Sequence, residues 1–264
     1  MSRPAATIVL PLLRQDPAYL AVALRTALDQ SVPGEVIVVT SPHTPAPERA
    51  ALTTAADGPH GDRLRVVERT RPGFASALNH GIEAATADRV GFLLTDDWLE
   101  PTALEESLVH DADIVSGGKT IWNAAGTERL PMPGLRTRAV YDTLTTDRER
   151  AAHLTHFLLF RRSSVLVVGG VDESIGDLAG VDDFDLPWSL LERGASVAFV
   201  GRSLYHVRDH PGERLTMRPK EERLAALDRI LRKHRVPEEE RAVIGAEYGA
   251  WYGKTLMDAW ETLS

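Results

Sequence analysis

Residues 90–101 read VGFLLTDDWLEP, an apolar run that stops on two adjacent carboxylates. The run over residues 90–95 predicts a strand buried on both faces, the kind found inside a parallel sheet. Asp96 and Asp97 then follow at the carboxyl end of this strand, where ligands bind in open α/β sheets. Because two close carboxylates repel each other, a hard divalent cation such as Mg²⁺ or Mn²⁺ would relieve the conflict. The alternative is a solvated Asp-Asp turn, which the pair alone does not exclude.

Strand and helix patterns alternate around this stretch. Apolar runs predict earlier strands over residues 6–13, 36–39 and 64–67. Helical spacing between them predicts helices over residues 17–30, 46–56 and 73–87. Such alternation is typical of a parallel sheet with helices on both faces. Neither a dinucleotide fingerprint nor a Walker loop occurs in the sequence, so a nucleotide would be bound by another scheme.

The pattern continues beyond the acidic pair, with a helix expected over residues 103–108 and a strand over residues 113–118. Residues 122–150 are rich in Gly, Pro and Arg, and we expect an irregular, substrate-facing segment or lid there.

The bulk composition bounds the possible functions. The chain has 264 residues and a net charge of −8, which argues against a nucleic-acid-binding surface. It contains no cysteine, so disulfides and thiolate metal sites are excluded. The sequence shows neither a signal-peptide pattern at its start nor an apolar run long enough for a membrane span. We therefore expect a soluble, cytoplasmic protein.

A second acidic stretch, GVDDFDLPWSLLERG, occupies residues 180–194. It predicts a helix that starts near Phe184 and stops at Gly194, with Asp182 and Asp183 at its N-terminus. Capping of that helix would explain one carboxylate, whereas three within four residues suggest a site. Asp185, the third, is expected to be structural.

A strand over residues 195–200 follows, and then a polar strand at residues 204–212, LYHVRDHPG. His206 and Arg208 would face one side of an extended segment, where His206 could ligate a metal and Arg208 could hold a phosphate. The alternative is a surface edge strand with its polar residues outward. Residues 219–264 show a helical pattern, and the aromatic face of the last helix predicts either internal packing or a homodimer contact.

Six motifs in order resemble landmarks of one family over about residues 6–216. They are IVLPL at 8–12, QS and EVIVV at 30–39, RPG and ALNHGI at 71–82, FLLTDDWLEP at 92–101, DDFDL at 182–186, and LYH with Arg208 at 204–208. In this order and spacing the chain resembles the family 2 inverting glycosyltransferases, which share the GT-A fold.

The resemblance implies an α/β, GT-A fold: a Rossmann-like, mostly parallel central sheet with helices on both faces and a helical C-terminal extension. It places the glycosyltransferase domain at residues 1–216 and the extension at residues 217–264. The nucleotide-sugar half would cover about residues 1–100 and the acceptor half about residues 101–216.

The implied activity is a hexosyltransferase-type, inverting transfer of a sugar from a nucleoside-diphosphate sugar to an acceptor hydroxyl. Asp183 matches the family's catalytic base and Asp182 is the second choice. Mn²⁺ or Mg²⁺ would sit on the diphosphate, held by Asp97, Asp96 and His206. The residues implied in nucleotide-sugar binding are Pro11, Leu12, Arg14, Thr40, Arg71, Gly73, Asn79, Asp96 and Arg208. The acceptor, whether a glycan, a lipid-linked sugar or a small metabolite, is not implied, and neither nucleic acid nor a membrane span is.

Five positions depart from the family pattern. Leu94 stands where many members have the first Asp of the metal motif, and Thr40 where many have an Asp that binds the base. Leu13 and Arg14 replace a frequent Tyr-Asn, and Leu78 replaces a frequent Arg. These departures leave open the alternative that the protein binds nucleotide sugars but is catalytically impaired. A sugar-phosphate nucleotidyltransferase ranks lower, because residues 11–15 lack the glycine-rich loop of that class.

Overall fold

The computed structural model describes residues 4–129, 137–175, 180–210, 212, 218–250 and 252. Within these residues one eight-stranded sheet organises the chain, in the order β3-β2-β1-β4-β7-β6-β8-β5. Its strands are β1 (Thr7–Pro11), β2 (Glu35–Thr40), β3 (Leu64–Glu68), β4 (Arg89–Phe92), β5 (Trp98–Leu99), β6 (Ile114–Trp122), β7 (Leu158–Arg161) and β8 (Val197–Arg208).

The sheet is mostly parallel. Strands β3, β2, β1 and β4 run parallel to one another, with Ile8 opposite Val36 and Val9 opposite Phe92. Strand β7 is antiparallel to both β4 and β6, β8 is parallel to β6, and the short β5 is antiparallel to β8. The four parallel strands place their carboxyl ends at one edge, which is where the predicted acidic loop begins.

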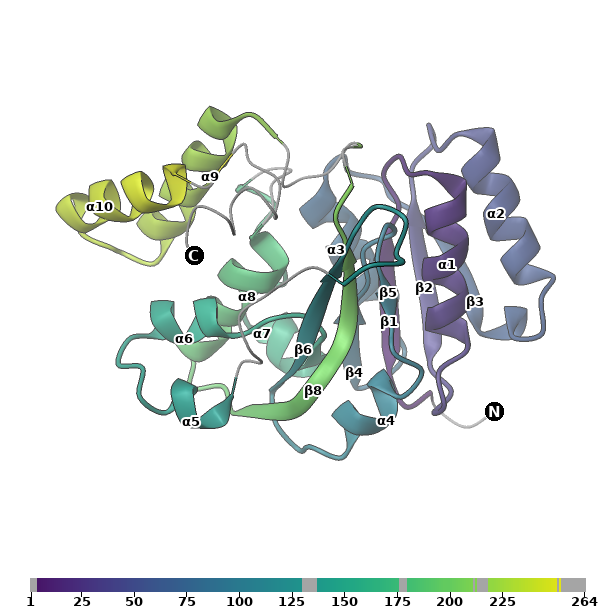
Figure 1. Cartoon of the computed structure of the whole chain (residues 1–264), viewed down its shortest axis with the longest axis horizontal. Helices are drawn as coiled ribbons and strands as arrows, with labels where there is room; N and C mark the ends of the chain where they lie inside the picture. The colour runs from purple at the N-terminus through teal and green to yellow at the C-terminus, as the bar shows by residue number, and fades with distance from the viewer. Residues whose placement is uncertain are drawn as a thin grey trace.

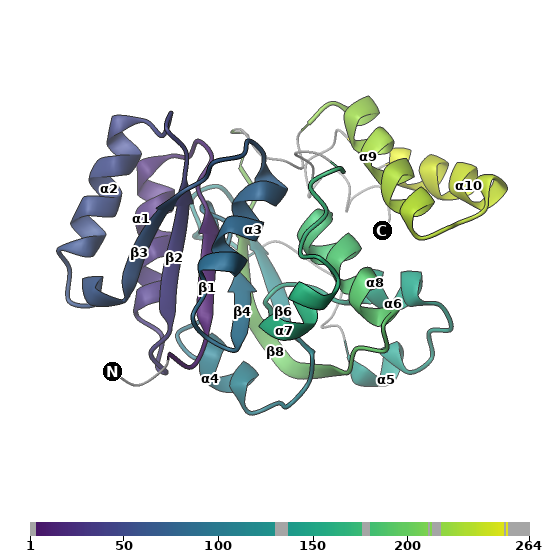
Figure 2. The same cartoon turned by 180° about the vertical axis from the view of Figure 1, so that it is seen from behind.

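Helices cover both faces of the sheet (Figures 1 and 2). They are α1 (Pro17–Leu28), α2 (Ala46–Ala56), α3 (Phe74–Ala84), α4 (Ala103–Leu108), α5 (Arg138–Tyr141), α6 (Asp147–His153), α7 (Arg162–Val167), α8 (Leu186–Leu191), α9 (Lys220–Lys233) and α10 (Glu238–Gly249). Helices α1, α2 and α4 lie on one face, and α3 and α7 lie on the other. One π-helical turn, η2 (Val181–Asp185), leads directly into α8.

The hydrophobic core is split between these two faces because side chains alternate along each strand. Ile8 and Leu10 pack in the cluster under α1 with Leu24, whereas Val9 packs in the cluster under α3 with Phe74. All five side chains are at most 2% exposed. The expected α/β sheet with two covered faces is therefore confirmed.

Two predicted strands have different lengths from those expected. β4 ends at Phe92, so the predicted strand over residues 90–95 is too long by three residues. Beyond it only the Leu93 N–H still bonds to β1, at the Val9 carbonyl (3.0 Å). β8 is longer than expected, because it runs unbroken through the predicted strand near residues 195–200 and the polar segment after it.

The expectation of an irregular segment over residues 122–150 is wrong in part. β6 reaches Trp122, and helices α5 and α6 lie within residues 138–153. Helix α6 starts with a capping box in which Thr146 and Glu149 each bond to the other's backbone N–H. Burial of Tyr141 and Ala151 in the core under α3 holds these helices in place. Residues 130–136 of the predicted lid lie outside the described residues.

Helices α9 and α10 form the C-terminal extension and lie beside α8, away from the sheet (Figure 1). Buried apolar residues Ala226, Leu227, Ile230, Leu231 and Ile244 join them to the main core. The predicted dimer face falls largely on residues 251 and 253–264, outside the described residues. None of the described helices is long and apolar enough to cross a membrane.

Candidate active site

In the loop after β4 the two adjacent carboxylates, Asp96 and Asp97, are buried to different extents. From residue 93 to residue 100 burial alternates, so that Asp97 lies inside with Leu99 while Asp96 lies on the opposite, more open side. The Asp97 carboxylate accepts hydrogen bonds from the Tyr205 hydroxyl (2.8 Å) and the Arg208 backbone N–H (2.9 Å). Because both oxygens have donors, Asp97 anchors the end of β8 to the acidic loop.

Asp96 faces a histidine that the sequence analysis did not select. The Asp96 Oδ2 lies 3.1 Å from His210 Nε2, and both side chains are nearly buried. His210 Nδ1 accepts a hydrogen bond from the Gly212 N–H, so the ring proton sits on Nε2 and is donated to Asp96. Asp96 and His210 are therefore hydrogen-bonded to each other, and they are the side chains at the end of β4 that could hold a cation.

His206, the predicted metal ligand, has both ring nitrogens in other contacts. Its Nδ1 accepts from the Trp122 indole N–H (3.0 Å), and its Nε2 bonds Glu100 (2.9 Å). The ring stacks on Trp98 at 5.2 Å, and burial lowers the His206 pKa. Among the described residues, no three His, Asp or Glu side chains converge as a metal site. Metal binding by His206 stays a prediction that would require one of these two contacts to break.

Arg208 is held by backbone carbonyls and aromatic rings. Its Nε donates to the Asp96 carbonyl (3.1 Å) and its Nη1 to the Ala124 carbonyl (2.9 Å). The guanidinium lies 4.3 Å from the centre of the Tyr19 ring and 4.8 Å from that of Trp98. These contacts fix the acidic loop against the turn after β6, and phosphate binding by Arg208 stays a prediction.

The second acid pair lies in the π turn η2. Asp182 is buried, whereas the Asp183 side chain is 35% exposed. His156 Nε2 lies between them, 3.6 Å from Asp182 Oδ2 and 3.7 Å from Asp183 Oδ2. Burial, followed by the charge of Asp183, raises the pKa of Asp182 to about 8. Burial lowers the pKa of His156 to about 4.

Helix capping does not account for this pair. The residues at the N-cap positions are Gly180 for η2 and Asp185 for α8, and neither makes a side-chain capping bond. The backbone N–H groups of Asp182 and Asp183 bond the Asp182 carboxylate and oppose the rise in its pKa. Asp183, the more exposed member, is thus left facing outward from the turn.

Tyr205 connects the two acid pairs. Its hydroxyl donates to Asp97 and accepts from the Leu94 N–H (3.1 Å), while its ring stacks on His156 with centres 4.9 Å apart. Burial and then the charge of Asp97 raise the Tyr205 pKa well above its usual value, so the hydroxyl remains a donor. The two acidic motifs, 85 residues apart in sequence, are brought to opposite sides of one tyrosine.

Asp185 supports the helix behind the second pair. It bonds Lys233 (2.7 Å) and His234 Nε2 (3.0 Å) of the C-terminal extension. The His234 ring also bonds Glu192 and stacks on Trp188 with centres 4.0 Å apart. This arrangement agrees with the structural role expected for Asp185 and ties the helical extension to the turn that holds Asp183.

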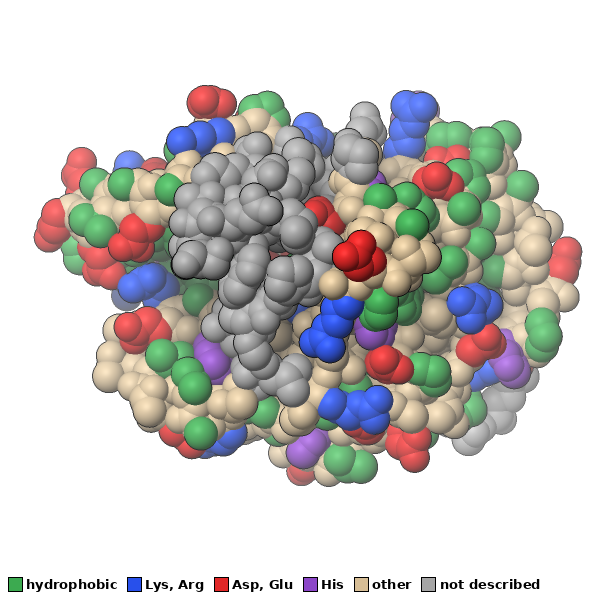
Figure 3. All heavy atoms as spheres, in the orientation of Figure 1, with side chains coloured by type: hydrophobic (Ala, Val, Ile, Leu, Met, Phe, Trp, Pro, Cys, Tyr) green, Lys and Arg blue, Asp and Glu red, His purple; other side chains and the backbone are tan. Residues whose placement is uncertain are grey.

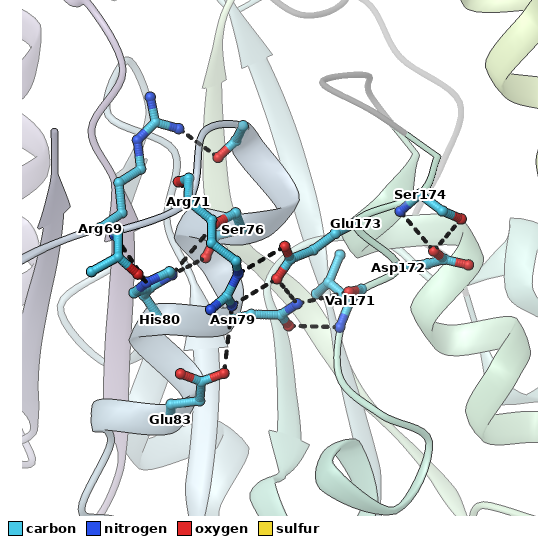
Figure 4. A network of polar contacts seen from close by, with 12 residues as sticks. Arg69, Arg71, Ser76, Asn79, His80, Glu83, Val171, Asp172, Glu173 and Ser174 are labelled. Carbon is cyan, nitrogen blue, oxygen red and sulfur yellow. Dashed lines mark hydrogen bonds and ion pairs between the residues drawn. The ribbon is translucent and has the colours of Figure 1, made fainter.

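Arg71 and Asn79, predicted to bind the nucleotide sugar, join α3 to the loop that follows α7 (Figure 4). Arg71 makes two hydrogen bonds to Glu173, at 3.0 and 2.9 Å. The Asn79 amide exchanges two hydrogen bonds of 2.8 Å with the backbone of Val171. Gly170 has φ +79°, and a Cβ there would lie 2.4 Å from Asn79 Oδ1. Nucleotide binding by these two side chains stays a prediction.

The other predicted donor contacts lie at or after the ends of the parallel strands. Pro11 ends β1, Leu12 is fully buried after it, and the side chain of Arg14 is exposed. Thr40 ends β2 and is buried. Gly73 has φ +106° at the N-cap of α3, a conformation that favours glycine. Leu12 exposes no surface in this structure, and its contact with a nucleotide sugar stays a prediction.

The protein-family model described as "Glycosyl transferase family 2" matches residues 7–166. This chain belongs to glycosyl transferase family 2. The match includes the acidic loop and His156, and the second acid pair follows it. The predicted family and its GT-A fold are confirmed.

Curated relatives of this family 2 member are distant. The O-antigen biosynthesis protein RfbC of Myxococcus xanthus is 27% identical over 210 residues, covering 78% of this chain and 16% of that protein. The uncharacterized glycosyltransferase EpsJ of Bacillus subtilis (strain 168) is 24% identical over 223 residues, covering 79% of this chain and 62% of that protein. The chain thus spans less than two thirds of the length of these relatives.

Solved structures share the fold of this family 2 member. The mannosyltransferase PcManGT from Pyrobaculum calidifontis, in complex with GDP-Man and Mn²⁺, matches with a TM-score of 0.61 and 21% identity, covering 93% of this chain and 69% of that one. S. aureus TarS 1–349, in complex with UDP-GlcNAc, matches with a TM-score of 0.60 and 16% identity, covering 92% and 71%. At these identities the likeness shows the GT-A fold alone.

Three residues of this family 2 site were missed from the sequence as site residues. His210 had a usable signal, because it continues the alternation of His206 and Arg208 and so falls on their side of an extended chain. Tyr205 was quoted only as part of a motif. His156 had no signal, since its contact with Asp182 depends on how two loops pack.

Proposed function

We propose that this chain moves a sugar from a nucleoside-diphosphate sugar to an acceptor hydroxyl, by one displacement that inverts the anomeric carbon. Family membership supports the reaction class. The observation that carries the assignment of roles is the junction of the two acid pairs at His156 and Tyr205, with the more open carboxylate of each pair left for chemistry.

Asp183 is the base in this proposal. Its side chain is the more exposed of the pair and is available to an acceptor hydroxyl. Removal of the hydroxyl proton during attack typically contributes about 10²–10⁴-fold to the rate. When the base lies opposite the departing diphosphate, the attack is in line and the product is inverted.

Asp96 and His210 are the residues that would hold a divalent cation, in place of the earlier set that included Asp97 and His206. The Asp96 carboxylate suits Mn²⁺ or Mg²⁺, and the imidazole of His210 adds a nitrogen whose Nε2 lies 3.1 Å from Asp96 Oδ2. A bound cation supplies Lewis-acid stabilisation of the charge on the leaving diphosphate. The His210 Nε2 proton must leave before that nitrogen can ligate, so metal binding releases a proton.

The donor is a nucleoside-diphosphate sugar, and UDP-GlcNAc and GDP-Man in the structural neighbours give the first two candidates. The acceptor is a glycan, a lipid-linked sugar or a small metabolite. Nucleic acid is not a partner in this proposal: the net charge is −8, and acidic and basic side chains are intermixed on the face seen in Figure 3.

A thermal-shift screen of UDP and GDP with and without Mn²⁺, followed by a transfer or donor-hydrolysis assay with the matching sugar, tests the proposal. We expect stabilisation by one nucleotide that depends on metal, and turnover that disappears in Asp183→Asn. Asp183→Asn with wild-type turnover would remove the base assignment.

A second candidate is a nucleotide-sugar-binding protein with impaired catalysis. Leu94 favours it, because this side chain packs against the core where many family members have a metal-binding Asp. Nucleotide binding with neither transfer nor hydrolysis in the wild-type protein would favour this candidate over the first.

A further inference from the structure

The His156–Asp182 contact leaves two buried polar atoms without hydrogen bonds. His156 Nδ1 and Asp182 Oδ2 have no partner, although the side chains are only 7% and 5% exposed. Buried polar groups are nearly always bonded, so such exceptions require an explanation. Because both residues lie beside Asp183, the missing hydrogen bonds are a feature of the second acid pair.

The surroundings of the contact compensate a charge only in part: the backbone N–H groups of Asp182 and Asp183 bond the Asp182 carboxylate, but burial outweighs them. The ring of Tyr205 from β8 covers one face of His156. Lys119 from β6 acts at longer range on both His156 and Asp182, and Asp183 is the nearest other charge. An ionised Asp182 would therefore lie buried beside a like charge, and a charged His156 would lie buried against an aromatic ring.

We propose that Asp182 and His156 share one proton between Oδ2 and Nε2 and form a pair without net charge. The atoms are 3.6 Å apart, so a movement of about half an ångström closes a hydrogen bond between them. The single proton supplies Asp182 Oδ2 with its missing hydrogen bond, and the Asp182–His156 pair then adds no charge beside Asp183. His156 is thus a positioning residue for the acid pair.

The consequence for catalysis rests on the proposed function of Asp183. If Asp182 were ionised, its charge would favour a proton on Asp183 and the base would be occupied before the reaction. With the neutral pair in place, Asp183 starts ionised and takes up the acceptor proton. The proton shared by Asp182 and His156 stays where it is, so the pair undergoes no net change.

The shared proton predicts a particular dependence of stability on pH. The pKa of Asp182 is raised from 3.8 to about 8, so its contribution to stability is present below pH 3.8 and is lost as the pH rises toward 8. The pKa of His156 is lowered from 6.5 to about 4, so its contribution is present above pH 6.5 and is lost as the pH falls toward 4. Between pH 4 and 6.5 the two contributions change stability with pH in opposite directions and cancel. Between pH 6.5 and 8 only the contribution of Asp182 still changes with pH.

Chemical denaturation of the full chain at several pH values measures these slopes in matched variants. In Asp182→Asn the folding equilibrium constant, relative to wild type, should rise with pH between 6.5 and 8, by up to about tenfold per pH unit. In His156→Phe, which keeps an aromatic ring against Tyr205, the relative constant should instead rise as the pH falls from 6.5 to 4. Asp97→Asn is the control, because Asp97 has donors on both oxygens and its difference from wild type should be constant from pH 6.5 to 8.

A difference between Asp182→Asn and wild type that does not change from pH 6.5 to 8 would overturn the proposal, whatever the transfer assay shows. Wild-type protein with ¹³C-labelled aspartate gives a second test that needs no variant. One buried carboxyl should keep the signal of a protonated or proton-sharing acid above pH 6. Absence of this signal would also overturn the proposal of a shared proton. If Asp183 proves not to be the catalytic base, both measurements still test the shared proton.

Discussion

The two acid pairs of this protein have the same sequence form and different surroundings. In each pair one carboxylate is buried and its neighbour is more open. Buried Asp97 receives two hydrogen bonds, from Tyr205 and from the backbone of Arg208. Buried Asp182 has an oxygen with no bond and a histidine beside it. Adjacent carboxylates therefore do not define one kind of site, because the groups around the buried member differ: Asp97 has a donor on each oxygen, whereas one oxygen of Asp182 has none.

The more open carboxylates of the two pairs, Asp96 and Asp183, lie in different parts of the site. Asp96 faces His210 at the end of the parallel strands, where diphosphates and cations are expected. Asp183 lies across the Tyr205–His156 stack from that end. Donor binding and base catalysis should thus be separable by mutation.

The largest effect is expected from Asp183→Asn, which preserves shape but removes the base. Transfer should fall by about 10²–10⁴-fold, as general-base catalysis is lost. A steady-state assay with the donor found by thermal shift measures it. Asp113→Asn, a carboxylate change at the opposite ends of the strands, is the control and should retain transfer.

Asp96→Asn should weaken nucleotide binding in Mn²⁺ by at least about 10–100-fold, because one of two protein ligands is changed. Fluorescence titration of the nucleoside diphosphate, with and without chelator, gives the measurement. Chelation should reduce the wild-type affinity toward that of the variant. An identical affinity of wild type with and without Mn²⁺ would show that Leu94 has abolished the metal site.

Tyr205→Phe keeps the ring on His156 and removes only the hydroxyl between Asp97 and the Leu94 N–H. The variant removes one hydrogen bond from the buried Asp97 carboxylate and one from the Leu94 N–H, and unfolding should become easier by about 1–3 kcal/mol. Urea denaturation checks this value. An unchanged stability would mean that Asp97 finds another donor and that the two pairs are not joined through this hydroxyl.

Asp113 provides a reference carboxylate far from both pairs. Burial raises its pKa, but hydrogen bonds from Ser196 and Ser164 and the charge of Arg161 outweigh burial and hold the pKa at about 2. Its contribution to stability is therefore present above pH 3.8 and is lost as the pH falls toward 2. Asp113→Asn should destabilise the protein by about 1–2 kcal/mol at pH 7, and the difference should shrink in acid. A difference that persists at pH 2 would contradict the assigned cause.

Most of the parallel half could be predicted because each strand is a short apolar run and each helix has a clear period. The rest could not, since the signals were weak or non-local. Strand β8 contains Gly201 and exposed polar residues, which made it look like two segments. Helix α6 did carry a local signal, the capping box of Thr146 and Glu149, inside a stretch that looked irregular.

The acidic residues of the candidate site could be predicted from the sequence, but the residues that contact them could not. Asp96, Asp97, Asp182 and Asp183 stand in motifs, whereas His156, Tyr205 and His210 become relevant only through contacts between distant segments. Periodicity also could not tell which member of each pair is buried. Burial does alternate through the acidic loop, but the apolar run before it is buried on both faces and does not show which residues point inward. The second pair lies in a π turn, where neither the strand nor the α-helical period applies.

The division of labour between the pairs can be tested by one calorimetric experiment. Mn²⁺ with the preferred nucleoside diphosphate is titrated into wild type, Asp183→Asn and Asp96→Asn under the same conditions. The account predicts that Asp183→Asn binds as wild type does and that Asp96→Asn loses most of the metal-dependent affinity. Equal loss of affinity in Asp183→Asn, or full affinity in Asp96→Asn, would contradict it.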